Sequence, residues 1–138
     1  VLLARDDAEN HLRFAAPFLR AGVPIYIDKP LACRTADARL LLAEERHRGQ
    51  IFTCSALRYA RELILDAEAL AALGTVRRVT GVAPKAWETY AVHAIEPIVA
   101  MLARLDVAPE TIWNITAVRE GEGAARGAFI AGGVQVEV

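Results

Sequence analysis

Apolar residues in the first part of the chain occur in short runs that alternate with segments of helical periodicity. Residues 1–4 form a continuous apolar run, which is typical of a strand buried on both faces of a sheet. Similar runs at residues 23–27 and 51–56 predict two more strands. The first intervening segment has apolar residues spaced i, i+3, i+4 and i+7, which predicts a helix: Leu12, Ala15, Ala16 and Leu19. The order strand, helix, strand, helix, strand indicates successive βαβ units in a parallel sheet.

Residues that favour helix ends set the limits of these two helices. Asp6 or Asp7 is expected to cap the first helix, and Gly22 is expected to end it. Thr35 is expected to cap the second helix, which would stop at Gly49.

The pattern changes after Arg58, where helices and strands no longer alternate regularly. A helix carrying Leu63, Ala67 and Leu70 is expected to end at Gly74, with a strand at residues 76–82. A further helix is predicted from apolar residues at helical spacing: Ile98, Met101, Leu102 and Leu105.

Proline and glycine complete the prediction for this second part. Pro97 is expected in the first turn of its helix, where a missing N–H is tolerated. Strands are expected at residues 112–118 and 128–138, joined by a flexible hairpin-like connection with the sequence EGEGAARG. The predicted fold class is α/β, with a parallel sheet followed by an α+β part with a mostly antiparallel sheet. The predicted domains are residues 1–58 and 59–138.

Composition and charge narrow the classes of function. The chain has 138 residues, 54% of them hydrophobic, and a formal net charge of −1. A nearly neutral chain without a basic block gives no electrostatic support for binding nucleic acid or a membrane surface. No apolar run approaches the roughly 20 residues that cross a bilayer, and no secretory signal is visible. We therefore expect no nucleic-acid or membrane partner.

The two cysteines, Cys33 and Cys54, lie far apart in the sequence. This usage fits reduced thiols in a cytoplasmic protein better than a disulfide framework. We expect a cytoplasmic location, no bond between the two sulfur atoms and no metal site. Because the chain opens directly on VLLA without an initiator Met, it is expected to be an internal segment of a longer protein.

Charged residues follow each of the three predicted parallel strands. They occur at residues 5–7, at Asp28-Lys29-Pro30 and within residues 55–59. Ligands of open α/β sheets bind at the carboxyl ends of the strands, so these clusters are candidate site residues. Lys29 can bind an oxygen or transfer its proton there. From the residues alone, Lys29 fits equally well a solvated lysine in an ordinary turn.

Several motifs in order resemble the Gfo/Idh/MocA oxidoreductases. The stretch AGVPIYIDKPLACRTADARLLLAEERHRGQIF contains Asp28-Lys29-Pro30 where the family has Glu-Lys-Pro. SALRY, LAALGTVRRVTG and WETYAVHAIEPIVAML resemble the following segments of the family, the last of which bears its active-site histidine. The resemblance covers roughly residues 1–105. It implies that residues 1–58 are the C-terminal half of a truncated Rossmann-like nucleotide-binding domain, and that residues 59–138 are part of an α+β domain for substrate binding and oligomerisation. It implies an oxidoreductase that transfers a hydride between NAD or NADP and a sugar, inositol or related polyol.

The resemblance also implies roles for individual residues. Lys29 matches the lysine where nicotinamide and substrate meet, and His93 matches the histidine that binds the substrate hydroxyl or exchanges its proton. These two are the expected catalytic residues, and their side chains are expected to converge. The implied cofactor-binding residues are Asp28, Lys29, Pro30 and Arg58, and the implied substrate-binding residues are Lys29, Tyr90 and His93. Without the resemblance, His93 would be interpreted as a structural histidine at a helix start.

The two other histidines are given structural roles. His11 matches a family histidine on the cofactor side, but we expect it to be structural. His47 is expected at the surface.

The chain departs from the family pattern at three places. Many members have an Asp four residues before the histidine, whereas this chain has Thr89. Either the proton relay is altered, or Tyr90 or Glu88 substitutes for the Asp. Asp6 and Asp7 would disfavour a nearby pyrophosphate unless they serve only as caps. No G-x-G-x-x-G loop is present to seat a pyrophosphate, and the pair Gly132-Gly133 follows no helix-opening pattern. We therefore expect weak or no NAD(P) binding by this chain alone.

An alternative function is a non-catalytic ligand-binding or assembly module that keeps the fold. The missing glycine loop and Thr89 favour it. Under either hypothesis, unpaired strand edges and apolar faces predict association, and a homo-oligomer is the expected state.

Overall fold

The structure is a computed structural model that describes residues 1–108, 111–121 and 124–138. The chain divides into two compact units, Val1–Cys54 and Ser55–Val138, each described by itself below. The division falls four residues before the domain boundary predicted at residue 58. Ser55 belongs to the second unit because it begins the short helix η2 there. The assignment of nucleotide-binding and substrate-binding roles to the two units stays a prediction.

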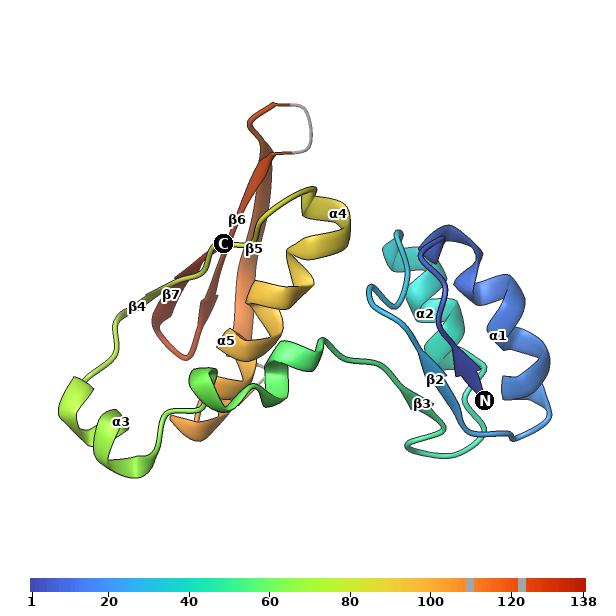
Figure 1. Cartoon of the computed structure of the whole chain (residues 1–138), viewed down its shortest axis with the longest axis horizontal. Helices are drawn as coiled ribbons and strands as arrows, with labels where there is room; N and C mark the ends of the chain where they lie inside the picture. The colour runs from blue at the N-terminus through green and yellow to red at the C-terminus, as the bar shows by residue number, and fades with distance from the viewer. Residues whose placement is uncertain (109–110, 122–123) are drawn as a thin grey trace. The chain divides into compact units, whose positions relative to one another are not determined.

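The first unit is a three-stranded parallel sheet covered by two helices (Figure 1). The strand order β1-β2-β3 follows the sequence. The strands are β1 (Leu2–Leu3), β2 (Ile25–Ile27) and β3 (Ile51–Phe52). The helices are the 3-10 helix η1 (Ala8–Asn10), α1 (His11–Arg20) and α2 (Thr35–Ala43). This arrangement confirms the parallel sheet predicted from the alternating pattern.

The core of the first unit lies between the sheet and the two helices. It consists of fully or almost fully buried residues from α1, β2 and α2: Ala15, Leu19, Ile25, Ile27 and Leu41. Burying a side chain such as Leu19 contributes about 2 kcal/mol of hydrophobic stabilisation. Gln50 is 1% exposed, and its amide donates hydrogen bonds to the carbonyl oxygens of Leu19 and Val23. These bonds join the end of α1 to the start of β3.

Several predicted ends of elements in this unit were wrong. The Asp7 side chain makes no cap hydrogen bond, because its carboxylate accepts from Arg5 and Asn10 instead. Arg34 rather than Thr35 is the N-cap of α2, and this helix ends at Ala43, well before Gly49. Gly22 follows α1 with a φ of 74°, as its predicted role requires.

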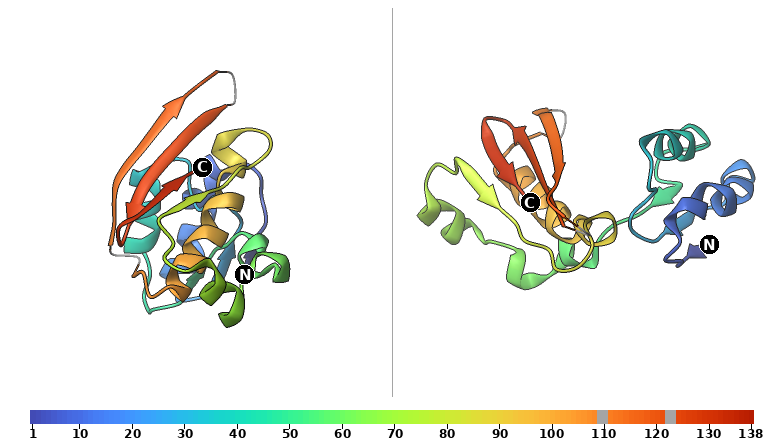
Figure 2. Two further views of the ribbon diagram at one scale, coloured as in Figure 1. Left: turned by 90° about the vertical axis from the view of Figure 1, so that its left-hand side faces the viewer. Right: turned by 90° about the horizontal axis from the view of Figure 1, so that it is seen from above.

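The second unit pairs a four-stranded sheet with a long helix (Figure 2). The strand order is β4-β7-β6-β5, parallel between β4 and β7 and antiparallel elsewhere. The strands are β4 (Arg78–Thr80), β5 (Ile112–Arg119), β6 (Ala125–Ala131) and β7 (Val134–Glu137). The helices are η2 (Ala56–Tyr59), η3 (Arg61–Leu63), α3 (Ala67–Leu73), α4 (Trp87–Tyr90) and α5 (Val92–Arg104). This sheet confirms the second half of the predicted fold class.

The core of the second unit forms where α5 lies along one face of the sheet (Figure 1). Its buried members are Ile98, Leu102, Ala131, Val134 and Val136. Residues of β7 alternate between buried and exposed or half-buried, which places its valines against α5.

Three predictions for this unit were wrong. Leu63, expected in one helix with Ala67 and Leu70, lies in η3, because α3 begins only after its N-cap Asp66. Residues 128–138 form parts of two strands rather than one, because Gly132 and Gly133 both have positive φ and turn the chain between β6 and β7. Pro97 lies inside α5 rather than in its first turn, because the helix begins at Val92. Pro97 has no N–H to donate to the carbonyl of His93 four residues earlier. Residues 122–123 of the predicted hairpin connection lie outside the described residues.

The cysteine environments differ between the two positions. Cys33 is an exposed thiol, and Cys54 is a buried one. Cys54 was predicted inside a strand, but β3 ends at Phe52 because its ladder with β2 stops there.

Candidate functional site

Lys29 lies in the turn that follows β2, at the carboxyl end of the parallel sheet. Its Nζ is 3.5 Å from a carboxylate oxygen of Asp28, and each of the two side chains is 24% exposed. The following peptide bond, Lys29–Pro30, is cis. The first unit therefore presents an ammonium group at the sheet edge where ligands of open α/β folds bind.

His11 holds this turn against the end of β1. The ring is 0% exposed, with Nε2 3.0 Å from the carbonyl oxygen of Arg5 and Nδ1 3.2 Å from that of Leu31. These contacts give His11 the structural role expected from the sequence. They also join the segments that follow two neighbouring strands.

Arg5 neutralises one of the two acids at the end of β1. Its guanidinium makes two hydrogen bonds to the carboxylate of Asp7, at 2.7 and 2.9 Å, and lies over the ring of Phe14. The bond from Arg5 lowers the pKa of Asp7 to about 2. Asp7 thus stands at the predicted N-cap position before η1, but its carboxylate pairs with Arg5 instead of capping the helix.

His93 lies in the first turn of α5 in the second unit, where the buried Ser55 holds its ring. Nδ1 of His93 is 2.7 Å from Oγ of Ser55, and Ser55 is 0% exposed. Oγ of Ser55 also accepts the backbone N–H of Leu57, which places it at the start of η2. We call Ser55, Tyr90 and His93 the His93 cluster.

Tyr90 packs beside the histidine ring, and Lys85 binds Tyr90 in turn. The ring centroids of Tyr90 and His93 are 5.5 Å apart and tilted by 53°. Nζ of Lys85 donates to the Tyr90 hydroxyl at 3.0 Å and lies 4.6 Å from the centre of its ring. Lys85 has a φ of 69°, which is uncommon for a residue with a side chain and is found often at functional sites.

Arg58 lies in η2, the same short helix that Ser55 begins. Its guanidinium is 3.7 Å from the carboxylate of Glu96 in α5. Two side chains of the η2 segment thus contact α5, Ser55 at His93 and Arg58 at Glu96. Arg58, expected to bind cofactor, helps to join η2 to α5.

The candidates for the missing Asp do not contact Nδ1 of His93. Thr89 donates to the carbonyl oxygen of Ala86, and Glu88 pairs with Arg119 at 2.6 Å. Tyr90 meets His93 through its ring rather than through its hydroxyl. The contact at Nδ1 of His93 is made by Ser55 instead.

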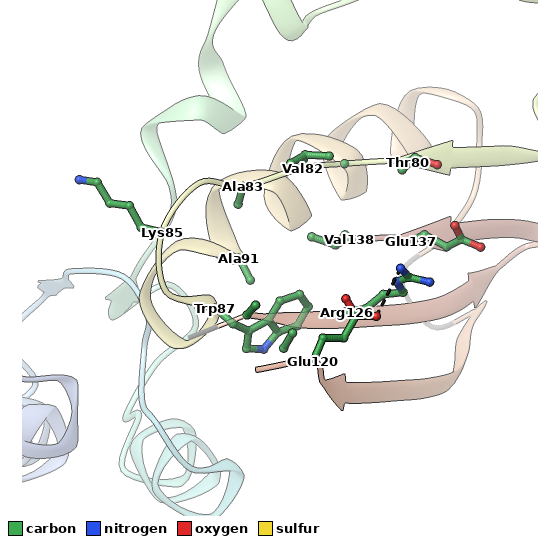
Figure 3. Close-up of a pocket in the computed structure, with 13 residues that line it drawn as sticks. Thr80, Val82, Ala83, Lys85, Trp87, Ala91, Glu120, Arg126, Glu137 and Val138 are labelled. Carbon is green, nitrogen blue, oxygen red and sulfur yellow. Dashed lines mark ion pairs between the residues drawn. The ribbon is translucent and has the colours of Figure 1, made fainter. Parts of the chain in front are cut away.

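A cavity of about 500 Å³ lies next to α4, on residues other than the expected site residues. Trp87 and the ion pair between Arg126 and Glu120 line it, while Lys85 extends away from them (Figure 3). No residue of the His93 cluster lines this cavity. Its charged lining residues are two acids, Glu120 and Glu137, and two bases, Lys85 and Arg126.

The described residues were also compared with the requirements of a metal site and of a membrane-spanning helix. No three His, Cys, Asp or Glu side chains in this part of the chain are grouped so that they could hold a metal ion. Among the helices described here, none has both the length and the apolar character needed to cross a bilayer.

The structure brings together some expected site residues and leaves others separate. Tyr90 and His93 are neighbours in the second unit, and Asp28, Lys29 and Pro30 share one turn in the first. The expected convergence of Lys29 with His93 joins the two units and stays a prediction. Sequence reasoning missed Ser55, although it begins the SALRY stretch; a serine before a short helix predicts a cap but not a histidine partner.

The fold is similar to that of a solved structure described as an oxidoreductase from Pseudomonas syringae. The match has a TM-score of 0.66 at 20% sequence identity and covers 100% of this chain. This chain spans 42% of the length of that protein. No family model matches the chain, and no curated protein sequence matches it. At this identity the similarity shows the fold, which is the α/β arrangement described above.

Proposed function

We propose that this chain is part of an oxidoreductase that transfers a hydride between NAD or NADP and a sugar, inositol or related polyol. The observation that carries the proposal is the buried anchoring of His93 by Ser55, which fixes an imidazole in one orientation. Such anchoring is typical of a histidine that binds or protonates a ligand. The resemblance to Gfo/Idh/MocA enzymes, together with the fold shared with an oxidoreductase, supports the same reaction class.

The residues of this chain fit one end of a dinucleotide cofactor. The turn with Asp28, Lys29 and Pro30 stands at the ligand-binding edge of a parallel sheet, as a nicotinamide site requires. The chain has no G-x-G-x-x-G loop to hold the pyrophosphate. When bound, the cofactor would supply or accept the hydride; the choice between NAD and NADP stays open.

In the proposed reaction, the protein residues act on the substrate oxygen. The Lys29 ammonium can donate a hydrogen bond or a proton to this oxygen, and the amine can take the proton back. His93 binds the same oxygen through a hydrogen bond and so fixes the orientation of the substrate hydroxyl. Tyr90 packs beside His93 and Lys85 binds the Tyr90 hydroxyl, so both can act as donors for a further hydroxyl of a polyol.

The test is steady-state kinetics of the complete gene product that includes these residues, with a panel of sugars and polyols. We expect nicotinamide reduction by at least one polyol. Lys29→Met and His93→Gln should each lower kcat/KM by about 10²- to 10⁴-fold, as the loss of a proton-transfer or oxygen-binding group does. His47→Gln is the matched control, because His47 is exposed and outside the His93 cluster.

A folded protein without hydride transfer to any substrate would instead support the non-catalytic ligand-binding module. So would variants of Lys29 and His93 with unchanged kinetics.

A further inference from the structure

We infer that Ser55 is a positioning residue that fixes the tautomer of His93, so that the ring presents a protonated Nε2 to the substrate oxygen. This division of roles deepens the proposed function and rests on it for its catalytic consequence. The tautomer itself follows from geometry within the second unit.

The hydrogen bonds of Ser55 decide where its single hydroxyl proton lies. A serine hydroxyl has one proton to donate and two lone pairs that accept. One lone pair accepts the N–H of Leu57, at 3.2 Å. The short contact of 2.7 Å to Nδ1 of His93 is the place where the proton of this buried hydroxyl can be used. If Nδ1 were the donor, the Ser55 proton would be left in a buried site without an acceptor among its described contacts, which is costly.

The contact with Ser55 also decides which nitrogen of the His93 ring carries its proton. A neutral imidazole has one N–H and one acceptor nitrogen. Because Nδ1 accepts from Ser55, the ring proton lies on Nε2. The hydrogen bond described for the His93 side chain is the one at Nδ1, so Nε2–H is the end of the ring that a ligand can use.

A carboxylate in place of Ser55 at Nδ1 would favour the opposite tautomer of His93. An ionised carboxylate can only accept, so it would bind Nδ1–H and leave Nε2 as a proton acceptor. Thr89 and Glu88 are turned to other partners here, and Ser55 donates instead. With Ser55 instead of a carboxylate at Nδ1, Nε2 of His93 is a hydrogen-bond donor rather than an acceptor.

This tautomer gives His93 and Lys29 different roles in the proposed reaction. A protonated Nε2 can donate a hydrogen bond to a carbonyl or hydroxyl oxygen but cannot take a proton from it. In the proposed reaction, removal of the hydroxyl proton during oxidation therefore belongs to the Lys29 amine, while His93 orients the oxygen. During reduction, the proton returns from the Lys29 ammonium to the same oxygen.

The test is two-bond ¹H–¹⁵N NMR of the imidazole rings in the complete gene product that includes these residues, at alkaline pH where imidazoles are neutral. The chain has three histidines, and the signals lost in His93→Gln identify the ring. We expect the pattern of a single Nε2–H tautomer for His93. In Ser55→Ala this pattern should be replaced by averaged tautomers, and Ser55→Thr should restore it. Tyr90→Phe is the matched control, because it keeps the ring that packs on His93.

An Nδ1–H tautomer in the unsubstituted chain would overturn the inference. So would an unchanged tautomer in folded Ser55→Ala. If Ser55→Ala does not fold, the tautomer of the unsubstituted chain alone decides. Because the measurement needs no substrate, an Nε2–H tautomer in a protein without hydride transfer would refute the proposed function and leave the tautomer assignment standing.

Discussion

Arg5 and Asp7 form an ion pair in the loop that follows β1. The sequence presents one base and two acids there, and periodicity does not indicate which of them pair. In the structure, Asp7 accepts two hydrogen bonds from Arg5 and one from Asn10, while Asp6 takes no part in them. The same limit applies to Ser55, because its partner His93 lies 38 positions away in the sequence.

The low pKa of Asp7 predicts a stability that depends on pH. Its pKa is lowered from an ordinary 3.8 to about 2, chiefly by the bond from Arg5. A carboxyl with a lower pKa in the folded state stabilises the fold above the unfolded pKa, and this contribution disappears as pH falls toward the folded value. We expect Asp7→Asn to lower the thermal midpoint at pH 7, with the difference from the unsubstituted chain closing between about pH 4 and about pH 2.

Calorimetry or circular dichroism at several pH values measures this difference. Because both side chains are partly exposed, added salt should reduce it. A difference that stays constant down to pH 2 would show that Asp7 acts through something other than its charge.

For the helices and strands, the sequence predicted well which elements exist and of which type they are, but it predicted their end residues poorly. Strands with continuous apolar runs and the helix with Ile98 and Leu102 were predicted because burial imposes their periodicity. Their ends depend on tertiary contacts. The strand expected at residues 51–56 stops at Phe52, and Ser55 leaves the sheet to begin η2. The turn at Gly132 and Gly133 was missed because a hairpin within a long apolar run looks like one continuous strand.

The helix α4, which leads into the His93 cluster, packs closely on the sheet at Gly127. A Cβ on Gly127 in β6 would overlap the ring of Trp87, so the indole of α4 lies directly on the strand backbone. We expect Gly127→Ala to lower the free energy of unfolding by about 1–3 kcal/mol through overpacking and to change tryptophan fluorescence.

Gly121→Ala is the matched control, because a Cβ there meets no atom within 4 Å. Chemical denaturation followed by fluorescence compares the two variants. Equal stability of both variants would mean that Trp87 does not rest on β6 in solution.

At the scale of the whole molecule, each unit exposes apolar side chains on its sheet. In the first unit, Leu2 is 70% and Phe52 is 51% exposed, and both flank Tyr26 in the strand register. In the second unit, β5 exposes Trp113, Ile115 and Val118, at 58%, 73% and 62%. Exposed apolar surface on strands that pair on one side only favours association.

We therefore predict that the 138-residue chain does not remain a monomer at micromolar concentration. Sedimentation velocity should show an oligomer or larger assemblies. Replacing Ile115 with Lys should shift the distribution toward the monomer if β5 carries the contact, whereas Leu40→Lys on the exposed side of α2 is the control. A sharp 15 kDa species for the unsubstituted chain would contradict the prediction.

Hydride transfer between a polyol carbon and nicotinamide is the reaction that we propose for the protein that includes these residues. Its most direct test supplies a polyol deuterated at the carbon that bears the reacting hydroxyl, together with oxidised NAD or NADP. Mass spectrometry of the recovered cofactor then measures the label. We predict deuterium in the reduced nicotinamide with the complete gene product and its strong reduction in Lys29→Met and His93→Gln. Reduced cofactor without deuterium, or no reduced cofactor from a folded protein across the whole panel, would contradict this proposal.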